Sequence, residues 1–159
     1  MVTLALMALA GASSASATTL EVGGSPKNES VEITASLEKG TSTLLQTTSG
    51  AFANTCTASH AKGATVGPYS ETKVSAPLSE LSFTSCSTEG IKVDELGSLS
   101  IEWIEGTTNG TVRSVGAEVT VPSPIGNLNC KTGEGVDIGT LTGKASGQAT
   151  LDVSAVLNC

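Results

Sequence analysis

The stretch from Asn127 to Gly139 reads NLNCKTGEGVDIG, and the chain closes with ATLDVSAVLNC from Ala149 to Cys159. The closing arm alternates apolar with polar residues, which is the period-2 pattern of a strand with one buried face. Glycines between the two arms predict tight turns. Each arm also contains one cysteine. We interpret the stretch as a strand-rich unit that is closed by its own two cysteines.

A weaker copy of this unit lies upstream, between Cys56 and Cys86. We therefore predict a weak internal duplication that relates residues of about 44–86 to residues of about 119–159. Glycines and cysteines are the signature residues of both copies, and these residues shape a fold. Neither copy contains an obvious catalytic group.

The four cysteines, Cys56, Cys86, Cys130 and Cys159, are separated by 30, 44 and 29 residues. Metal sites usually need close pairs such as C-x-x-C, so this spacing favours two disulfides. Three connectivities are possible. We favour Cys56 with Cys86 and Cys130 with Cys159, because each bridge then closes its own copy. Closing a loop of this length stabilises a chain by about 3–4 kcal/mol in the chain-entropy model.

Alternating apolar and polar stretches recur about every ten residues, and Gly, Pro or Asn separate them. Beyond residue 17, no stretch of useful length has the 3.6-residue period of a helix. We predict a single all-β domain over residues 18–159, an antiparallel β-sandwich of the Greek-key, immunoglobulin-like type. A small closed β-barrel is the alternative. The predicted strands cover residues 18–22, 31–37, 41–48, 52–57, 78–86, 97–104, 111–121, 127–132, 136–142 and 149–159.

Two regions between these strands have the composition of loops. Residues 59–63 read SHAKG and predict an exposed polar loop, whereas residues 106–110 end in Asn-Gly and predict a hairpin turn. In this hairpin we expect Leu99, Ile101 and Trp103 to share a buried face. We expect Val119 and Val121 to meet that face from the partner strand.

Residues 1–17 have features of a signal peptide. The run from Val2 to Ala10 is apolar, and Ala15-Ser16-Ala17 is an A-x-A cleavage site. No Lys or Arg precedes the apolar run, since the first charged residue is Glu21. We favour a true start further upstream, so that this sequence contains only part of the leader. A weak export signal is the alternative. Both interpretations predict a secreted, extracellular protein.

The charge of the chain limits its partners. The formal net charge is -7, and Arg113 is the only arginine. Nucleic-acid binding needs clustered basic side chains, so we expect no nucleic-acid partner. Beyond the leader no stretch is apolar enough to span a bilayer, and we expect no membrane insertion. An extracellular protein or a glycan is the expected kind of partner.

Several phrases of the sequence resemble a group of small exported proteins of high-GC Gram-positive bacteria. The phrases are SG before NTC (49–56), GTTNGTV (106–112), CKTG with DIGTLTG (130–143), and ATLD followed by the final Cys159. The likeness covers the whole mature chain. It implies a bacterial, exported origin. The group has no assigned activity, so the resemblance supplies no site residues.

Hydrolase chemistry has few candidate residues in this chain. The only histidine is His60, and we expect it on the surface, away from any Ser and Asp partners. Asp137 with Asp152 or Glu134 is a conceivable carboxylate pair, but glycosidases line their sugar clefts with aromatic rings and the chain has four rings. We therefore predict a protein that is not an enzyme, with an unrecognised hydrolase as the third hypothesis.

Glu134 and Asp137 form the one candidate metal site. GEGVD (133–137) follows the G-x-G-x-D core of a calcium-binding repeat, in which glycines shape the turn and oxygen atoms bind the ion. The motif occurs once, whereas adjacent repeats share each ion in that architecture. A plain β-turn is the favoured interpretation, so we expect no cofactor, with calcium as the alternative.

These observations predict an exported, non-enzymatic β-sandwich that acts as a cell-surface or extracellular structural or interaction module. The alternative is a ligand-binding module for calcium, a glycan or a small apolar molecule. Exposed rings bind sugars by stacking, but Trp103 alternates in phase with Leu99 and Ile101, so we assign it to the core.

Overall fold

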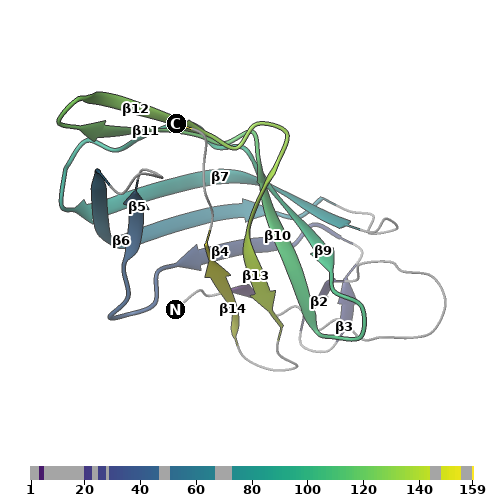
Figure 1. The fold of residues 1–159 in the computed structure, drawn as a ribbon. Helices are drawn as coiled ribbons and strands as arrows, with labels where there is room; N and C mark the ends of the chain where they lie inside the picture. Colours follow the sequence, from purple (N-terminus) through teal and green to yellow (C-terminus); the bar gives the residue numbers. More distant parts are fainter. Residues whose placement is uncertain are drawn as a thin grey trace.

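Figure 1 shows the fold in a computed structural model of the chain. The structure describes residues 4–5, 20–22, 25–27, 29–46, 51–66, 73–143, 148–154 and 159. All regular elements among these residues are strands. The predicted all-β class is therefore confirmed.

Fourteen strands are described. They are β1 (Leu4–Ala5), β2 (Leu20–Val22), β3 (Ser25–Lys27), β4 (Glu32–Ser36), β5 (Thr43–Gln46), β6 (Ala53–Ala64), β7 (Lys73–Cys86), β8 (Lys92–Glu95), β9 (Ser98–Trp103), β10 (Asn109–Val115), β11 (Glu118–Ser123), β12 (Gly126–Lys131), β13 (Val136–Thr142) and β14 (Gln148–Val153). The largest sheet has the order β1-β14-β13-β10-β9-β7-β6-β4, and β5 also pairs with β6. A second sheet has the order β12-β11-β8, and β2 pairs with β3.

Three long strands pass through both main sheets, because each bends once. β8 continues into β9, β10 into β11, and β12 into β13, with only a few residues between the segments. β10 pairs with β9 and β13, and β11 pairs with β8 and β12, so the neighbours stay the same across the bend. In Figure 1 the antiparallel strands β9, β10 and β13 lie along a common axis, and β11 and β12 are turned away from it. One three-stranded ribbon is thus divided between two sheets.

Glycines allow these bends. Gly97 has a φ of 66° and Gly116 a φ of 70°, in the left-handed region that side chains with a Cβ rarely adopt. A Cβ at Gly97 would collide with Val115 O and would lie 2.6 Å from Ala117 N. The backbones of two bent strands approach each other here more closely than a side chain would permit.

The connections form a meander. When each bent pair of segments is counted as one strand, every strand from β5 onward pairs with the next strand in sequence, and β4 pairs with β6 on the same edge as β5. We expected Greek-key, immunoglobulin-like connections. In this fold the chain instead passes from one sheet to the other by bending within a strand, and not through a loop that crosses between the sheets.

Two apolar clusters form the core of the fold. The first contains Val74, Ile101, Val112, Leu141 and Ala149, and partly buried residues such as Val31 and Ala35 pack against it. The second contains Val119, Val121 and Cys130, with Leu45, Phe52 and Phe83 among the residues packed on it. The large sheet therefore curls over itself at one end and lies over the β12-β11-β8 sheet at the other.

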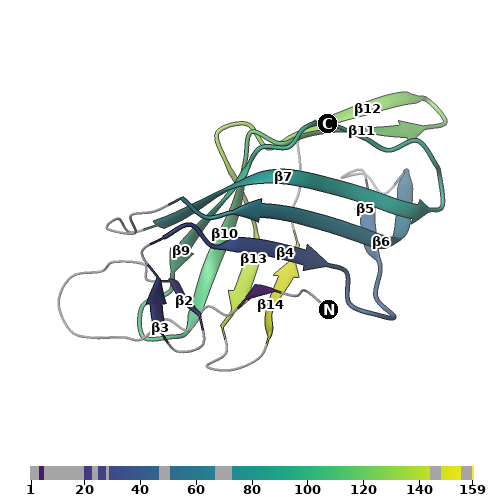
Figure 2. The same cartoon turned by 180° about the vertical axis from the view of Figure 1, so that it is seen from behind.

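The two views in Figures 1 and 2 show this curled arrangement from opposite sides. β1 lies against β4, the strand at the opposite end of the sheet order. No backbone pairing joins them among the described strands. The described strands thus form an antiparallel β-sandwich that resembles a half-barrel, and their pairing does not close into the barrel that was the alternative.

The predicted loop at residues 59–63 is wrong. These residues lie within β6, where His60 pairs with Ser36 on one side and Ser82 on the other. Their polar side chains suggested a loop. These residues are polar because β6 has an outer face. A strand that is paired on both edges does not require apolar residues on both faces.

The predicted strand over residues 111–121 is confirmed for most of its residues, but its continuity is wrong, because it is interrupted at Gly116. β10 ends at Val115 and β11 begins at Glu118. Ile101 consequently lies opposite Val112, while Val119 lies opposite Val93 and Cys130. The valines of β11 belong to the second cluster, not to the face of β9 where we expected them.

Candidate functional site

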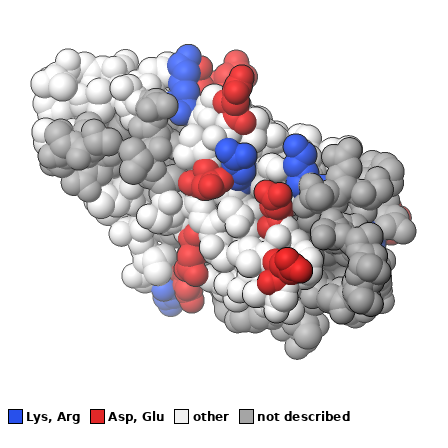
Figure 3. Space-filling model, turned by 45° about the vertical axis from the view of Figure 1, so that its right-hand side comes forward, with Lys and Arg blue, Asp and Glu red and all other residues white. Residues whose placement is uncertain are grey.

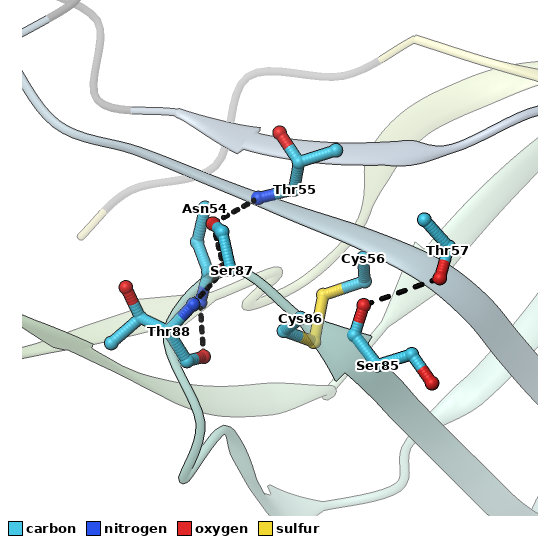
Figure 4. Close-up of a disulfide and its surroundings, with 8 residues drawn as sticks. All are labelled: Asn54, Thr55, Cys56, Thr57, Ser85, Cys86, Ser87 and Thr88. Atoms are coloured by element: carbon cyan, nitrogen blue, oxygen red, sulfur yellow. Dashed lines mark hydrogen bonds between the residues drawn. A yellow bond between two sulfur atoms is a disulfide. The ribbon is translucent and has the colours of Figure 1, made fainter.

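Both disulfides join the predicted partners. Cys56 on β6 and Cys86 on β7 are register partners, with Cα atoms 3.9 Å apart, and Cys56 is fully buried (Figure 4). Cys130 on β12 is bonded to the terminal Cys159. The local connectivity predicted from the sequence is therefore confirmed. The proposed internal duplication stays a prediction.

A buried polar network lies beside the first disulfide (Figure 4). Asn54 is completely buried, and its amide donates to Thr88 O at 2.8 Å. Asn54 Oδ1 accepts from Thr88 N at 3.0 Å and from the Ser87 hydroxyl at 2.9 Å. The amide group thus pairs with the Thr88 backbone as a neighbouring peptide group would. It attaches the segment after β7 to the start of β6.

The end of β7 has an unusual backbone at the same place. Ser85 has a φ of 54°, and it is the one non-glycine residue with a positive φ in the described chain. Its carbonyl accepts a hydrogen bond from the Thr57 hydroxyl at 3.3 Å. Beyond Cys86, Ser87 N donates to Thr55 O at 2.8 Å. These contacts explain how the fold is held here, and they have a structural role.

A second polar cluster covers the outer face of the β12-β11-β8 sheet. Its members alternate with the buried residues of the same strands and point away from the second apolar cluster. We call this group the outer-face network, and it comprises Lys92, Asp94, Glu118, Thr120, Asn129 and Lys131. Lys92 Nζ lies 3.1 Å from Asp94 Oδ1, and Lys131 Nζ lies 2.8 Å from Glu118 Oε2.

The two carboxylates of the outer-face network are held in their charged form. The Thr120 hydroxyl donates to Asp94 at 2.6 Å, and this bond together with Lys92 lowers the pKa of the Asp94 carboxyl. Lys131 and the Asn129 amide, which donates at 2.6 Å, lower the pKa of Glu118. Both carboxylate side chains are 23% exposed. The network therefore presents oriented charges and hydrogen-bonding groups on a rigid sheet.

Charges elsewhere are mixed in sign. On the face that Figure 3 shows, basic and acidic side chains lie among one another. On the outer face of β4, β6 and β7, for example, Lys62 lies 3.3 Å from Glu32 and is the register partner of Glu80. Such exposed pairs contribute little to stability, typically less than about 1 kcal/mol each.

The candidate calcium residues lie at the bend between β12 and β13. Asp137 Oδ1 is 2.8 Å from Arg113 Nε, and Arg113 Nη2 donates to Gly135 O at 3.3 Å. Glu134 is exposed in a turn that the bond from Gly135 N to Thr132 O closes. The guanidinium thus occupies the side of the turn where the carboxylate and a carbonyl oxygen converge. Calcium binding stays a prediction, and it requires Arg113 to move.

His60 lies on β6 with its side chain 43% exposed. Its Nε2 atom is 3.9 Å from Glu80 Oε2, which is a longer separation than a hydrogen bond. The residues opposite His60 in register are Ser36 on β4 and Ser82 on β7. The aspartates considered as catalytic candidates lie in another part of the large sheet, Asp137 on β13 and Asp152 on β14.

Trp103 lies at the rim of the fold. The ring is half-buried, and its Nε1 donates to Thr107 O at 2.8 Å in the turn between β9 and β10. It shares a strand with Leu99 and Ile101, as predicted, but only Ile101 is a fully buried member of the first cluster. Trp103 therefore fixes the turn instead of filling the core.

Sequence reasoning did not identify the outer-face network. The signal was present, because Glu118 and Thr120 alternate with Val119 and Val121. Alternation predicts an outward face for the polar pair, but it does not show which neighbouring strands bring Asp94 or Lys131 to them. Within the described residues, no three His, Cys, Asp or Glu side chains are grouped closely enough to hold a metal ion.

Comparisons with protein-family models, with curated proteins and with solved structures found no match. Among the residues that the structure describes, no helix is long and apolar enough to cross a membrane.

Proposed function

We propose that this chain is an exported structural or interaction module that works outside the cell and has no catalytic role. The two disulfides are the observation that carries this proposal. Disulfides form and persist mainly in oxidising compartments, and small domains with thin cores depend on them. The all-β fold and the leader-like residues 1–17 agree with the same interpretation.

The outer-face network is the surface that we assign to contact with the partner. Its side chains are already oriented by one another, so binding would cost little side-chain entropy. Amide, hydroxyl and charged groups lie together on one face of the sheet, and these groups recognise polar surfaces by hydrogen bonding. An extracellular protein or a glycan of the cell envelope is the partner class that fits.

The test measures binding of the chain, with both disulfides formed, to isolated envelopes of the cells that produce it. We expect saturable binding that the double variant Asp94→Asn with Glu118→Gln weakens several-fold. Glu102→Gln is the matched control, because Glu102 is an exposed carboxylate on β9. Equal binding of all three proteins, or no saturable binding, contradicts the assignment of this surface.

Export is tested separately. The gene, with its upstream sequence, is expressed in its host, and the chain is sought in the culture medium. We expect a product that begins near Thr18. Retention of the intact chain inside the cell would contradict the proposal.

A further inference from the structure

β5 is an edge strand whose outer side is open. All its register partners lie on β6, from Thr43 opposite Cys56 to Gln46 opposite Ala53, and none of the described residues pairs with the other side. Leu45 packs on the second apolar cluster, whereas Leu44 is 55% exposed. An open edge presents unpaired N–H and C=O groups that can pair with another strand.

Two other edge strands, β8 and β12, have features that oppose such pairing. Three of the four residues of β8 are charged. On β12, Lys131 is charged and Cys159 is bonded to Cys130 with their Cα atoms 4.0 Å apart, so the chain end lies directly against this strand. While residues 1–17 remain on the chain, β1 pairs with β14 at Gln148 and Ala149 and also lies against β4. Charges and covering segments are the usual protections of edge strands.

β5 lacks these protections. Residues 40–59 include no Asp, Glu, Lys, Arg or His, although the whole chain has a formal net charge of -7. Two such segments can therefore approach each other without bringing like charges of their own together, whereas the net charge repels the copies as a whole. In both ribbon views β5 lies at the end of the molecule away from β2 and β3 (Figures 1 and 2).

We infer that two copies of this chain associate by pairing their β5 strands antiparallel across a twofold axis. Directly opposed residues in such a pair point to the same face of the sheet. Even-numbered residues of one β5 must therefore lie opposite even-numbered residues of the other, and odd-numbered opposite odd-numbered. Centring the pair on Leu44 places the two Leu44 side chains opposite each other on the outer face. Thr43 of one copy then lies opposite Leu45 of the other, which extends the inner face.

The association is expected to be weak. A pair of four-residue strands with one exposed leucine each buries much less than the roughly 1,200–2,000 Å² of a stable interface. Because the copies repel each other through their net charge, added salt should strengthen the dimer by screening that repulsion. A dimer held by opposite charges would instead weaken in salt.

The first test is sedimentation equilibrium of the full chain, with both disulfides formed, over a range of concentrations and salt. We expect a monomer–dimer equilibrium that shifts toward dimer as salt increases, and at least a tenfold loss of association in Leu44→Lys. Ile125→Lys is the matched control, since Ile125 is 88% exposed at the β11–β12 turn. A wild-type monomer at all concentrations overturns the inference, as does a dimer that only Ile125→Lys weakens.

The second test checks the register. A cysteine on the twofold axis lies opposite the same cysteine of the second copy. Directly opposed residues in an antiparallel pair have a Cα separation that a disulfide can span. Under mild oxidation, Leu44→Cys should form a covalent dimer faster than Ser42→Cys. Equal rates for the two variants, or faster crosslinking at position 42, would contradict pairing centred on Leu44. Neither test depends on export or on the outer-face network.

Discussion

Thr132 and Ala117 are joined by hydrogen bonds across the bend between the two main sheets. Thr132 N donates to Ala117 O at 3.0 Å, and Ala117 N donates to the Thr132 hydroxyl at 2.8 Å. Both residues are buried. The Thr132 side chain thus satisfies an amide that regular strand pairing leaves unpaired where β10 turns into β11.

Thr132→Val should therefore destabilise the protein by about 1–3 kcal/mol, because it leaves the buried Ala117 N–H without a partner while it preserves side-chain shape. Urea unfolding monitored by circular dichroism measures this free energy. Thr84→Val on the exposed side of β7 is the control, with an expected change within about 0.5 kcal/mol. Equal effects of the two substitutions would show that the Thr132 hydroxyl has no such role.

Asn54→Asp should destabilise the fold in a pH-dependent way. The carboxylate can still accept from Thr88 N, but it cannot donate to Thr88 O, and ionisation in a buried site is unfavourable. The pKa of the new carboxyl should be higher when the chain is folded than when it is unfolded. Its cost relative to wild type should consequently grow as pH rises from about 4 to 7.

Thermal melts of Asn54→Asp and wild type at several pH values measure that difference. Asn127→Asp, on the exposed part of β12, is the control and should change little at any pH in this range. A constant difference between Asn54→Asp and wild type across the range would argue against a buried carboxyl at this position.

Acid should weaken the wild-type protein through the outer-face network. Asp94 and Glu118 have lowered pKa values in the folded state, so they bind protons less readily there than in the unfolded chain. Their contribution to stability is present above the unfolded pKa, near 4, and is lost as pH falls toward the folded pKa. The double variant Asp94→Asn with Glu118→Gln should show a smaller loss of stability below pH of about 4. An unchanged acid profile would contradict this role.

Removing either disulfide should lower the free energy of unfolding by about 3–4 kcal/mol in the chain-entropy model, since the two bridges close loops of similar length. The local effects should differ. Cys56→Ser with Cys86→Ser leaves two strands that still pair, whereas Cys130→Ser with Cys159→Ser releases the chain end from β12. Hydrogen exchange should therefore increase in β12 mainly in the second variant, and equal protection of β12 in both would contradict this expectation.

The alternation of residues predicted much of this fold. The strand expected over residues 136–142 is β13, and the cysteines pair as the two-copy interpretation suggested. Alternation shows which face of a strand is buried, but it does not show which sheet a strand joins. For this reason Gly116 was included in one continuous strand, although the chain bends there with a φ of 70°.

The same limit applies to the stretch NLNCKTGEGVDIG. Its glycines suggested a calcium turn at Glu134 and Asp137, whereas in the structure Gly133 and Gly135 have positive φ values at the bend between β12 and β13. Arg113 reaches Asp137 from β10, a strand more than twenty residues earlier in the sequence. Contacts of this kind depend on the register between strands, which no local pattern specifies.

The most direct test of the exported, disulfide-stapled module is non-reducing peptide mapping of the chain recovered from the culture medium. Trypsin separates the four cysteines into the peptides 40–62, 74–92, 114–131 and 145–159. We predict that peptide 40–62 is linked to 74–92 and that 114–131 is linked to 145–159. Free thiols on these peptides, or a link between 40–62 and 114–131, would contradict the account.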